Sequence, residues 1–436
     1  MSIETVGIIV ILAVFILMFL RVPIVLSMAL PAFIAILYLK NEKVLFTAIE
    51  SVIWDRSYNY TLSTVPLFVL MGQLLFTAGF TDDLFDTFRK FFGRIRGGLG
   101  FATIAASAVF ASSSGSSLAT TSTIGLVSSK EMLKSNYSKV LTGGSIVAGG
   151  TLGILIPPST MFIIYGMITE QSIGKLLIAG IVPGILLSLL FILTIYVCIK
   201  IKPDLVGDQL DDPVSWKEKL SSLKVNIWIL SLFAVVMGGI YLGFFTATEA
   251  AGVGALGAFI IALIRRKLTV KSFGDAVFGT IKTTGFIFAI VMGAFLLNYV
   301  LTITRVPNIL ADFLLEANLS PGVFFFLMVV MYLILGAIMD TLAMVVVTIP
   351  ILLPTLIAYD FNLIWFGVII VLLVELALIS PPVGMNCFVL RGVVKELDLG
   401  SIFKGAVIFA IPIISLIALL YFFPDVAIFL PDLIKG

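Results

Sequence analysis

The sequence predicts an all-α polytopic membrane protein, built as an inverted repeat of two halves with about ten transmembrane helices and two re-entrant hairpins. Three observations predict this class: the composition, the placement of lysine and arginine, and a set of landmarks that recurs in the second half. Of the 436 residues, 60% are hydrophobic and 12% are charged, whereas about 25% of the residues in a soluble domain are charged. At about 20 residues per crossing, the apolar residues suffice for at most roughly 13 spans.

The composition also excludes several functions. A chain this apolar is neither a soluble enzyme nor a nucleic-acid binder, and a net charge of +2 does not indicate a polyanionic partner. The chain has no histidine, which excludes a Ser-His-Asp triad and histidine metal ligands. Its two cysteines, Cys198 and Cys387, lie within apolar runs and form neither a disulfide framework nor a CxxC metal site.

Two of the apolar runs differ from ordinary membrane spans. The run 98–127 has a polar centre at Ser112–Ser117. The run 321–359 is too long for one straight crossing and has Gly336 and Asp340 near its middle. Each arm beside such a centre has about 15 residues, too few to span the bilayer, so each run is predicted to re-enter the membrane as a hairpin. The other runs, which are predicted to span, fall near 5–20, 22–39, 61–80, 141–166, 176–200, 225–243, 246–264, 282–303, 364–390 and 405–423.

The placement of lysine and arginine supports the hairpins, because short cytoplasmic loops are enriched in these residues. With the N-terminus outside, the loop that contains Arg89 and Arg96 is inside after three crossings. The lysines within 130–139 are also inside only if the run 98–127 re-enters and returns. A second hairpin, open to the outside, places Arg391 inside as well. Ten spans and two hairpins therefore satisfy the charge rule, with both termini outside, whereas twelve plain spans do not.

Several landmarks of the first half recur in the second. Met71-Gly72 matches Met292-Gly293, and Gly115 matches Gly336, both at an offset of 221 (293 − 72 and 336 − 115). The proline pair at 157–158 recurs at 381–382, an offset of 224 (381 − 157). Because the first hairpin opens inward and the second outward, the repeat is inverted. An inverted repeat indicates a secondary transporter with its site near the membrane midplane. The less apolar segments 41–57 and 266–281 are predicted as interfacial arms, with ordinary amphipathic loops as the open alternative.

Two kinds of motif indicate a cation site. In the serine cluster, hydroxyl groups and the backbone of Gly115 provide oxygen ligands for sodium. The alternative is a stripe of small residues for close helix packing, but such stripes place small residues about every fourth position rather than six in a row. Each proline pair removes helical N–H donors, so carbonyls one turn earlier lose their partners. A kink without function is the alternative, and the matched break at Ser380-Pro381-Pro382 argues against it.

Two carboxylates are predicted to lie at membrane depth, where charge is costly and usually functional. Asp340 is interpreted as balancing a cation or accepting hydrogen bonds from substrate hydroxyls, or else as a cap of the second hairpin arm. Glu375 corresponds to Thr151 of the first repeat (375 − 224 = 151), and direct ligation and support of other ligands are equally open for it.

These motifs together resemble the large membrane subunit of tripartite ATP-independent periplasmic (TRAP) transporters, the DctM type. The resemblance covers nearly the whole chain and rests on GGTLGILIPPS at 149–159, AGIVPG at 179–184, FTATEAAG at 245–252, GAIMDTLAMVVVTIPILLP at 336–354 and ELALISPPVGMN at 375–386. The chain departs from the family pattern at three positions. Ala247 replaces proline, Ala377 replaces glycine and Ser380 replaces threonine, and the last two lie in the implied second sodium site.

The resemblance implies a sodium-driven elevator importer in the bacterial inner membrane, with two or more Na⁺ ions transported and no organic cofactor. A periplasmic binding protein would deliver a carboxylate, a sialic acid or a C4-dicarboxylate. A small four-helix membrane subunit would enlarge the scaffold, and we expect it to be a separate chain. The implied division is a first repeat 1–202 (scaffold 5–60, transport elements 61–166), a linker 203–224, and a second repeat 225–436 (scaffold 225–281, transport elements 282–390).

The resemblance also implies site residues. The first sodium site would comprise Ser112, Ser113, Gly115, Gly153, Ile156 and Pro157. The second would comprise Gly336, Ala377 and Ser380. Substrate would lie near Ser116, Ser159, Asp340 and Asn386.

Three other functions are weighed against this one. A channel would conduct without a binding protein, and no ring of like charges marks a pore. An intramembrane serine hydrolase would have no histidine or adjacent lysine to activate its serine. A self-sufficient sodium/carboxylate symporter is the nearest alternative, and uptake by this chain alone would identify it. The sequence does not identify the carboxylate, the number of sodium ions or the oligomeric state.

Cysteine labelling tests the opposed hairpins. In a chain whose native cysteines are replaced by serine, we expect an impermeant maleimide to label Asp360→Cys on intact cells and Lys134→Cys only after permeabilisation. Labelling of both positions from the same face would contradict the inverted arrangement.

Overall fold

The computed structural model describes residues 1–57, 60–207 and 214–433, and every regular element in these ranges is helical. Residues 208–213 of the predicted linker lie outside the described residues. The first half contains α1 (Ile3–Phe19), α2 (Ile24–Leu39), α3 (Glu42–Ser57), η1 (Tyr60–Ser63), α4 (Thr64–Thr77), α5 (Phe80–Phe92), α6 (Gly98–Ser114), α7 (Ser117–Lys134), α8 (Lys139–Leu155), α9 (Thr160–Thr169), α10 (Ile173–Ala179), α11 (Ile181–Ile201) and η2 (Pro203–Leu205).

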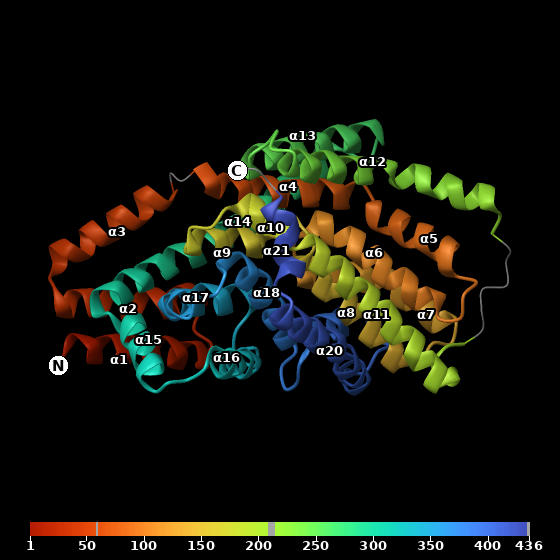
Figure 1. Cartoon of the computed structure of the whole chain (residues 1–436). Coiled ribbons are helices and arrows are strands. Elements are labelled where there is room, and N and C mark those ends of the chain that lie inside the picture. The colour runs from red at the N-terminus through yellow and green to blue at the C-terminus, as the bar shows by residue number, and fades with distance from the viewer. Residues whose placement is uncertain (58–59, 208–213, 434–436) are drawn as a thin grey trace.

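The second half has a matching succession of helices. It contains α12 (Trp216–Tyr241), α13 (Ala247–Ile264), α14 (Val270–Thr304), α15 (Val306–Glu316), α16 (Pro321–Leu335), α17 (Thr341–Ala358), α18 (Leu363–Ile379), α19 (Met385–Val393), α20 (Leu399–Phe422) and α21 (Asp425–Asp432). Figure 1 shows α1, α2 and α3 at one end of the molecule, and α12 and α13 over α4 on one face.

The predicted all-α polytopic class is confirmed. Among the described residues, six helical stretches are long and apolar enough to cross a membrane, or eight if each of two bent pairs counts as one span. One bent pair is α8 with α9, at 42°, and the other lies within α12. Five further apolar helices have 15 to 17 residues: α1, α2, α6, α16 and α18. The number of ten crossings stays a prediction.

Packing between the halves is reciprocal. Helix α13 of the second half packs against α4 of the first, and α2 of the first packs against α14 of the second. In the same way α7 packs against α19, while α17 packs against α9. The two halves therefore exchange equivalent contacts, as a two-fold relation between them requires, and the elements that surround the proline breaks come from both.

The two predicted hairpins differ in how their two helical arms pack. Helices α6 and α7 pack against each other and against α8, with a two-residue connection between them. By contrast, α16 packs on α18, and α17 packs mainly on α15, α9 and α14. By length and composition α17 is also one of the six stretches that could cross a membrane.

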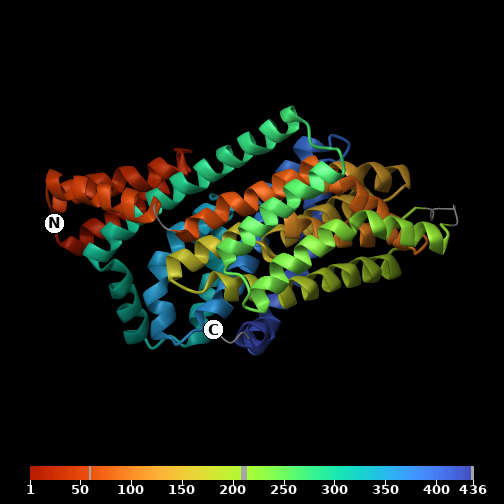
Figure 2. The same ribbon diagram turned by 90° about the horizontal axis from the view of Figure 1, so that it is seen from above.

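Helix α14 differs from the sequence-based expectation. The segments 266–281 and 282–303 were expected as an interfacial arm followed by a span, but residues 270–304 form one unbroken helix of 35 residues. Its length is about 52 Å at 1.5 Å per residue. Figure 2 shows it crossing the molecule diagonally to reach the α1–α2 end. The expected boundary between scaffold and transport elements at 281/282 therefore falls inside a continuous helix, whereas in the first half the equivalent α3 and α4 are separate.

The centre of the molecule depends on close helix contacts through glycine. Where α20 crosses α8, a Cβ atom on Gly405 would lie 2.3 Å from the carbonyl oxygen of Val140 and 2.6 Å from the Cα of Gly144. Backbones approach this closely in membranes only through very small residues. The contact brings α8, and with it the first proline break, into a fixed position against the C-terminal helices.

Alanine substitution tests this contact. We expect Gly405→Ala to destabilise the chain by about 1–3 kcal/mol, because its methyl group would have to displace backbone atoms. The matched control is Gly252→Ala on α13, where nothing lies within 4 Å of the added Cβ. Thermal unfolding in detergent measures both variants. A melting temperature of Gly405→Ala at or above that of the unsubstituted chain would contradict the described packing.

Candidate functional site

The first hairpin tip lies directly on the first proline break. Helix α6 ends at Ser114 and is capped by Gly115, whose φ of +57° is a left-handed conformation that glycine adopts without strain. The Gly115 carbonyl accepts a hydrogen bond of 3.1 Å from the Thr160 hydroxyl. A Cβ atom on Gly115 would also lie 3.1 Å from the carbonyl oxygen of Pro158. The structure thus brings the tip and the break together, as predicted.

Gly153 brings α8 against the same tip. A Cβ atom on Gly153 would lie 2.5 Å from the carbonyl oxygen of Ser116 and 2.8 Å from the Thr120 hydroxyl oxygen. Helix α8 ends at Leu155, and Ile156 is extended. In a continuous helix the carbonyls of Gly153 and Ile154 would accept from residues 157 and 158, which are prolines without N–H groups. These carbonyls are therefore free of their helical partners beside the tip.

The second break repeats this arrangement. Helix α18 ends at Ile379, and Ser380 is extended before the second proline pair. The carbonyls of Ala377 and Leu378 lack helical partners because residues 381 and 382 are prolines, although Ala377 accepts a 3.2 Å bond from the Ser380 N–H. A Cβ atom on Gly336 would lie 2.3 Å from the Cβ of Ala377. The second tip thus contacts the second break as closely as the first tip contacts the first.

The predicted hydroxyl ligands are engaged with their own helices. Ser112 donates to the Val109 carbonyl at 2.6 Å, and Ser113 donates to the Phe110 carbonyl at 2.8 Å. Ser380 likewise donates to the Leu376 carbonyl at 2.6 Å. A hydroxyl group that donates its hydrogen keeps lone pairs that are able to bind a cation. The three side chains therefore stay compatible with the predicted role.

A cavity of about 380 Å³ lies between the two hairpin tips and the helices α4 and α14. The four predicted substrate residues divide in two: Ser116 and Asp340 line the cavity, whereas Ser159 and Asn386 are fully buried outside its lining. The Ser159 hydroxyl has no hydrogen-bond partner among the described residues. Ser114 and Ser117 of the predicted serine cluster also line the cavity. Other polar residues line it without having been predicted, among them Gln73, Ser122, Thr160 and Thr283.

Asp340 caps the start of a helix and also lines the central cavity. Its carboxylate accepts a 2.8 Å hydrogen bond from the Ala343 N–H, so it is the N-cap of α17. The same residue borders the cavity next to Thr341 and Leu342. The capping interpretation and the cavity interpretation are therefore both compatible with the structure. Its position at a helix N-terminus adds the helix dipole to the environment of the cavity.

A second cavity of about 590 Å³ adjoins the first, because Phe76 and Thr123 line both. Its wall carries charges, among them Lys130 and a network in which Arg89 pairs with Asp86 at 2.9 Å and with Glu131 at 3.2 Å. These charges belong to the segments that the charge rule places in the cytoplasm. The central cavity therefore borders a polar space on that side.

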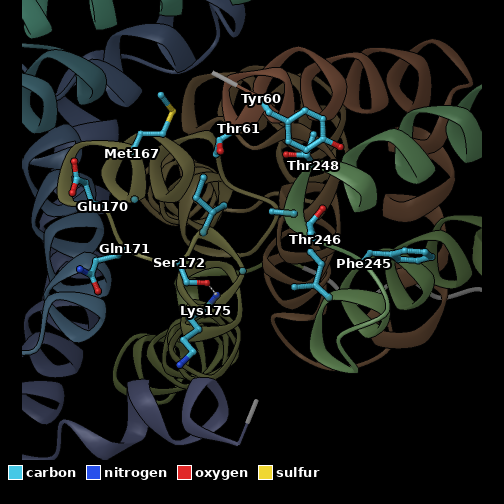
Figure 3. A pocket seen from close by; sticks show the side chains of 15 residues that line it. Tyr60, Thr61, Met167, Glu170, Gln171, Ser172, Lys175, Phe245, Thr246 and Thr248 are labelled. Atoms are coloured by element: carbon cyan, nitrogen blue, oxygen red, sulfur yellow. Dashed lines mark hydrogen bonds between the residues drawn. The ribbon is translucent and has the colours of Figure 1, made fainter. Parts of the chain in front are cut away.

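A third cavity, of about 600 Å³, lies on the side that the charge rule places outside. Figure 3 shows side chains from two parts of the chain around it, Glu170, Gln171 and Lys175 on one side and Tyr60 and Thr246 on the other. No residue of the two tips lines this space. The tips therefore border the central cavity and not this one.

The family is shown by comparison with known proteins. The model of the "Tripartite ATP-independent periplasmic transporter, DctM component" matches residues 11–426. This chain belongs to the DctM family. It is therefore a multi-pass membrane permease of a bacterial TRAP transporter.

Individual DctM-family relatives extend over most of the chain. The C4-dicarboxylate TRAP transporter large permease protein DctM of Pseudomonas aeruginosa is 34% identical over 407 residues, covering 93% of this chain and 94% of that protein. The sialic acid TRAP transporter large permease protein SiaM of Vibrio cholerae is 32% identical over 380 residues, covering 87% of this chain and 88% of that protein.

A solved structure shares the fold of this DctM-family chain. The Alcanivorax borkumensis YdaH transporter matches it with a TM-score of 0.61 at 12% identity, covering 88% of this chain and 90% of that one. At this level of identity the similarity concerns the fold alone. Because it covers 88% of the chain, it extends over both halves.

Proposed function

We propose that the chain is the large transmembrane subunit of a sodium-coupled importer of a carboxylate. The observation that carries this proposal is the pairing of each hairpin tip with a proline break beside one cavity. Each pair offers free carbonyl and hydroxyl oxygens, which are the ligands that broken membrane helices use for sodium. The central cavity then receives the anion next to the cations, so that neither charge has to cross the membrane alone.

Sodium would supply the energy for uptake. Each sodium ion that enters along the membrane potential releases about 2.3 kcal/mol per 100 mV, before its concentration gradient is counted. Two or more ions would suffice to accumulate an anion against its gradient. The sequence contains no Walker A motif for ATP binding. Coupling to ions is therefore the energy source that this chain's residues support.

The proposed ligands follow the two contacts. The first site would use residues of the first tip and break: Ser112, Ser113, Gly115, Gly153, Ile156 and Pro157. The second would use Gly336, Ala377 and Ser380. Ser116 and Asp340 would contact the substrate from the cavity wall. Ser159 and Asn386 lie outside that wall, and Asn386 would instead act through the hydrogen bond that its side-chain amide donates to the Ser117 hydroxyl.

The substrate class follows from the relatives. The two large permeases described above are named for C4-dicarboxylate and for sialic acid, and both of these substrates carry carboxylate groups. The polar lining of the central cavity, with the hydroxyl group of Thr283 and the amide of Gln73, supplies hydrogen-bond donors for such an anion.

An elevator movement would connect the two sides. The position of the charged cavity at Arg89 and Lys130 directly beside the central cavity supports release of substrate to the cytoplasm in this arrangement. The tips, breaks and cavity would move together past the scaffold helices. In this movement α14 would serve as a long connecting lever, because it packs against both α2 and α17.

The remaining partners are proposed from the family description, which names a tripartite and periplasmic system. A periplasmic binding protein would deliver the substrate, and a small four-helix membrane subunit, as a separate chain, would extend the scaffold in the inner membrane. Both termini would lie in the periplasm. Exposed apolar side chains on α1, such as Ile8, Leu12 and Ile16, give that end a surface suited to lipid or to a membrane subunit.

Uptake into proteoliposomes tests the proposal. The complete transporter, with small subunit and binding protein, is supplied with radiolabelled C4-dicarboxylate or sialic acid in sodium chloride or in choline chloride. We expect uptake of one of these anions in sodium and only background uptake in choline. Undiminished uptake in choline would contradict sodium coupling. Full uptake by this chain without either partner would instead identify a self-sufficient symporter.

A further inference from the structure

A chain of buried hydrogen bonds joins the first hairpin to the second broken helix. The Ser117 hydroxyl, at the start of α7, donates to Oε2 of Glu375 on α18 at 3.0 Å. The same hydroxyl accepts a 2.7 Å hydrogen bond from the Asn386 side-chain amide on α19. Ser117 is separated from these partners by 258 and 269 residues in the sequence. One hydroxyl group thus connects the two halves.

This bridge lies deep in the protein. Ser117 is 2% exposed, and Glu375 and Asn386 are 0% exposed. Neither Oε1 of Glu375 nor Oδ1 of Asn386 has a hydrogen-bond partner among the described residues. A buried polar group without partners costs considerable free energy. The Ser117 hydroxyl therefore stabilises both side chains, and withdrawal of α7 from α18 and α19 would leave the carboxyl group unsatisfied.

The bridge lies between two contacts, that of the first hairpin tip with the first proline break and that of the second tip with the second break. Each of these contacts is called a tip-and-break pair below. Ser117 directly follows Ser116, whose carbonyl oxygen lies against Gly153 of the first break. Glu375 stands about half a helical turn before Ala377, which contacts Gly336 of the second tip. A displacement of the first tip would thus change the hydrogen bonding of the helix that forms the second break.

We propose that Ser117 and Glu375 are positioning residues, which make the ordering of the first tip and of the second break depend on each other. The inference rests on the proposed function in one respect, that the two tip-and-break pairs bind sodium. In that case the bridge makes the two sites form together, so that a transporter loaded with one ion favours the second. Neither residue has to contact the ion or the substrate for this role.

Hydrogen exchange of the full chain in sodium-free choline buffer tests the bridge. Each substitution is made on one side of the bridge, and the exchange of backbone amides is measured in the segment on the other side. In Ser117→Ala we expect peptides covering 376–388 to exchange about tenfold faster, because one buried hydrogen bond is lost and the Glu375 carboxyl group is left without a partner. The matched control is Ser128→Ala on the same helix, whose buried hydroxyl donates to its own helix at Ile124. Unchanged exchange of 376–388 in Ser117→Ala would overturn the proposal.

Two substitutions of Glu375 separate positioning from general loss of structure. Glu375→Gln keeps an oxygen that accepts from Ser117, so exchange of peptides covering 112–120 should stay within about twofold of the unsubstituted chain. Glu375→Leu has similar volume but no acceptor, and should raise exchange there about tenfold. Peptides from α20 should be unaffected by either. Equal exchange of 112–120 in the Gln and Leu variants would contradict the inference.

Addition of sodium then distinguishes this inference from the function on which it rests. In the unsubstituted chain we expect the backbone amides of 112–120 and 376–388 to become protected from exchange at the same sodium concentration. In Ser117→Ala we expect the sodium concentrations of half-maximal protection to differ about tenfold between the two segments. Coincident midpoints in Ser117→Ala would overturn the linkage of the two sites. If sodium protects neither segment in the unsubstituted chain, sodium coupling is contradicted. The exchange rates of the variants in sodium-free buffer would then still show whether the bridge links the two segments.

Discussion

The structure depends on one constraint: backbone carbonyls inside a membrane protein must find partners within the protein. Two proline pairs, at 157–158 and 381–382, remove the N–H groups that would satisfy the carbonyls one turn earlier. In both places a hairpin tip approaches the break through glycine, Gly115 onto the first and Gly336 onto the second. The residues whose carbonyls lose their helical partners are thereby buried in the protein.

The arrangement of the halves places this polar part at their interface. Each half contributes its own tip and its own break, while α7 and α17 pack on the short helices α19 and α9 of the opposite half. The central cavity lies between the tips and the helices α4 and α14, which also belong to different halves. A site built in this way responds to the relative position of the two repeats, which is the property that alternating access requires.

The sequence predicted much of this because its signals are local. Proline pairs, glycines and a serine-rich interruption mark breaks and tips without knowledge of the fold, and the serine cluster and Asp340 were singled out in this way. The pairing of each tip with its break, through Gly153 and Gly336, was implied by the resemblance to the family. The unbroken α14 was not predicted, because the less apolar segment 266–281 was interpreted as a separate interfacial arm. A helix of 35 residues accommodates the charges of this region because Lys271, Asp275 and Lys282 are exposed.

Contacts between distant residues were beyond the reach of sequence reasoning. Glu375 was recognised as an unusual carboxylate, but its partner Ser117 is 258 residues away and its neighbours in sequence are apolar. The burial of Ser159 and Asn386 outside the cavity wall is likewise a result of packing between helices. Gln73 gave a usable signal, as a polar side chain inside an apolar run, that was not followed.

Equilibrium binding of radioactive sodium to the purified chain tests the central claim most directly, that each proline break and its glycine tip hold one cation. The account predicts saturable binding that loses one ion per chain in Gly153→Ala and one in Gly336→Ala, because each added methyl group would push a tip off its break. Binding that is unchanged in both folded variants would contradict the account.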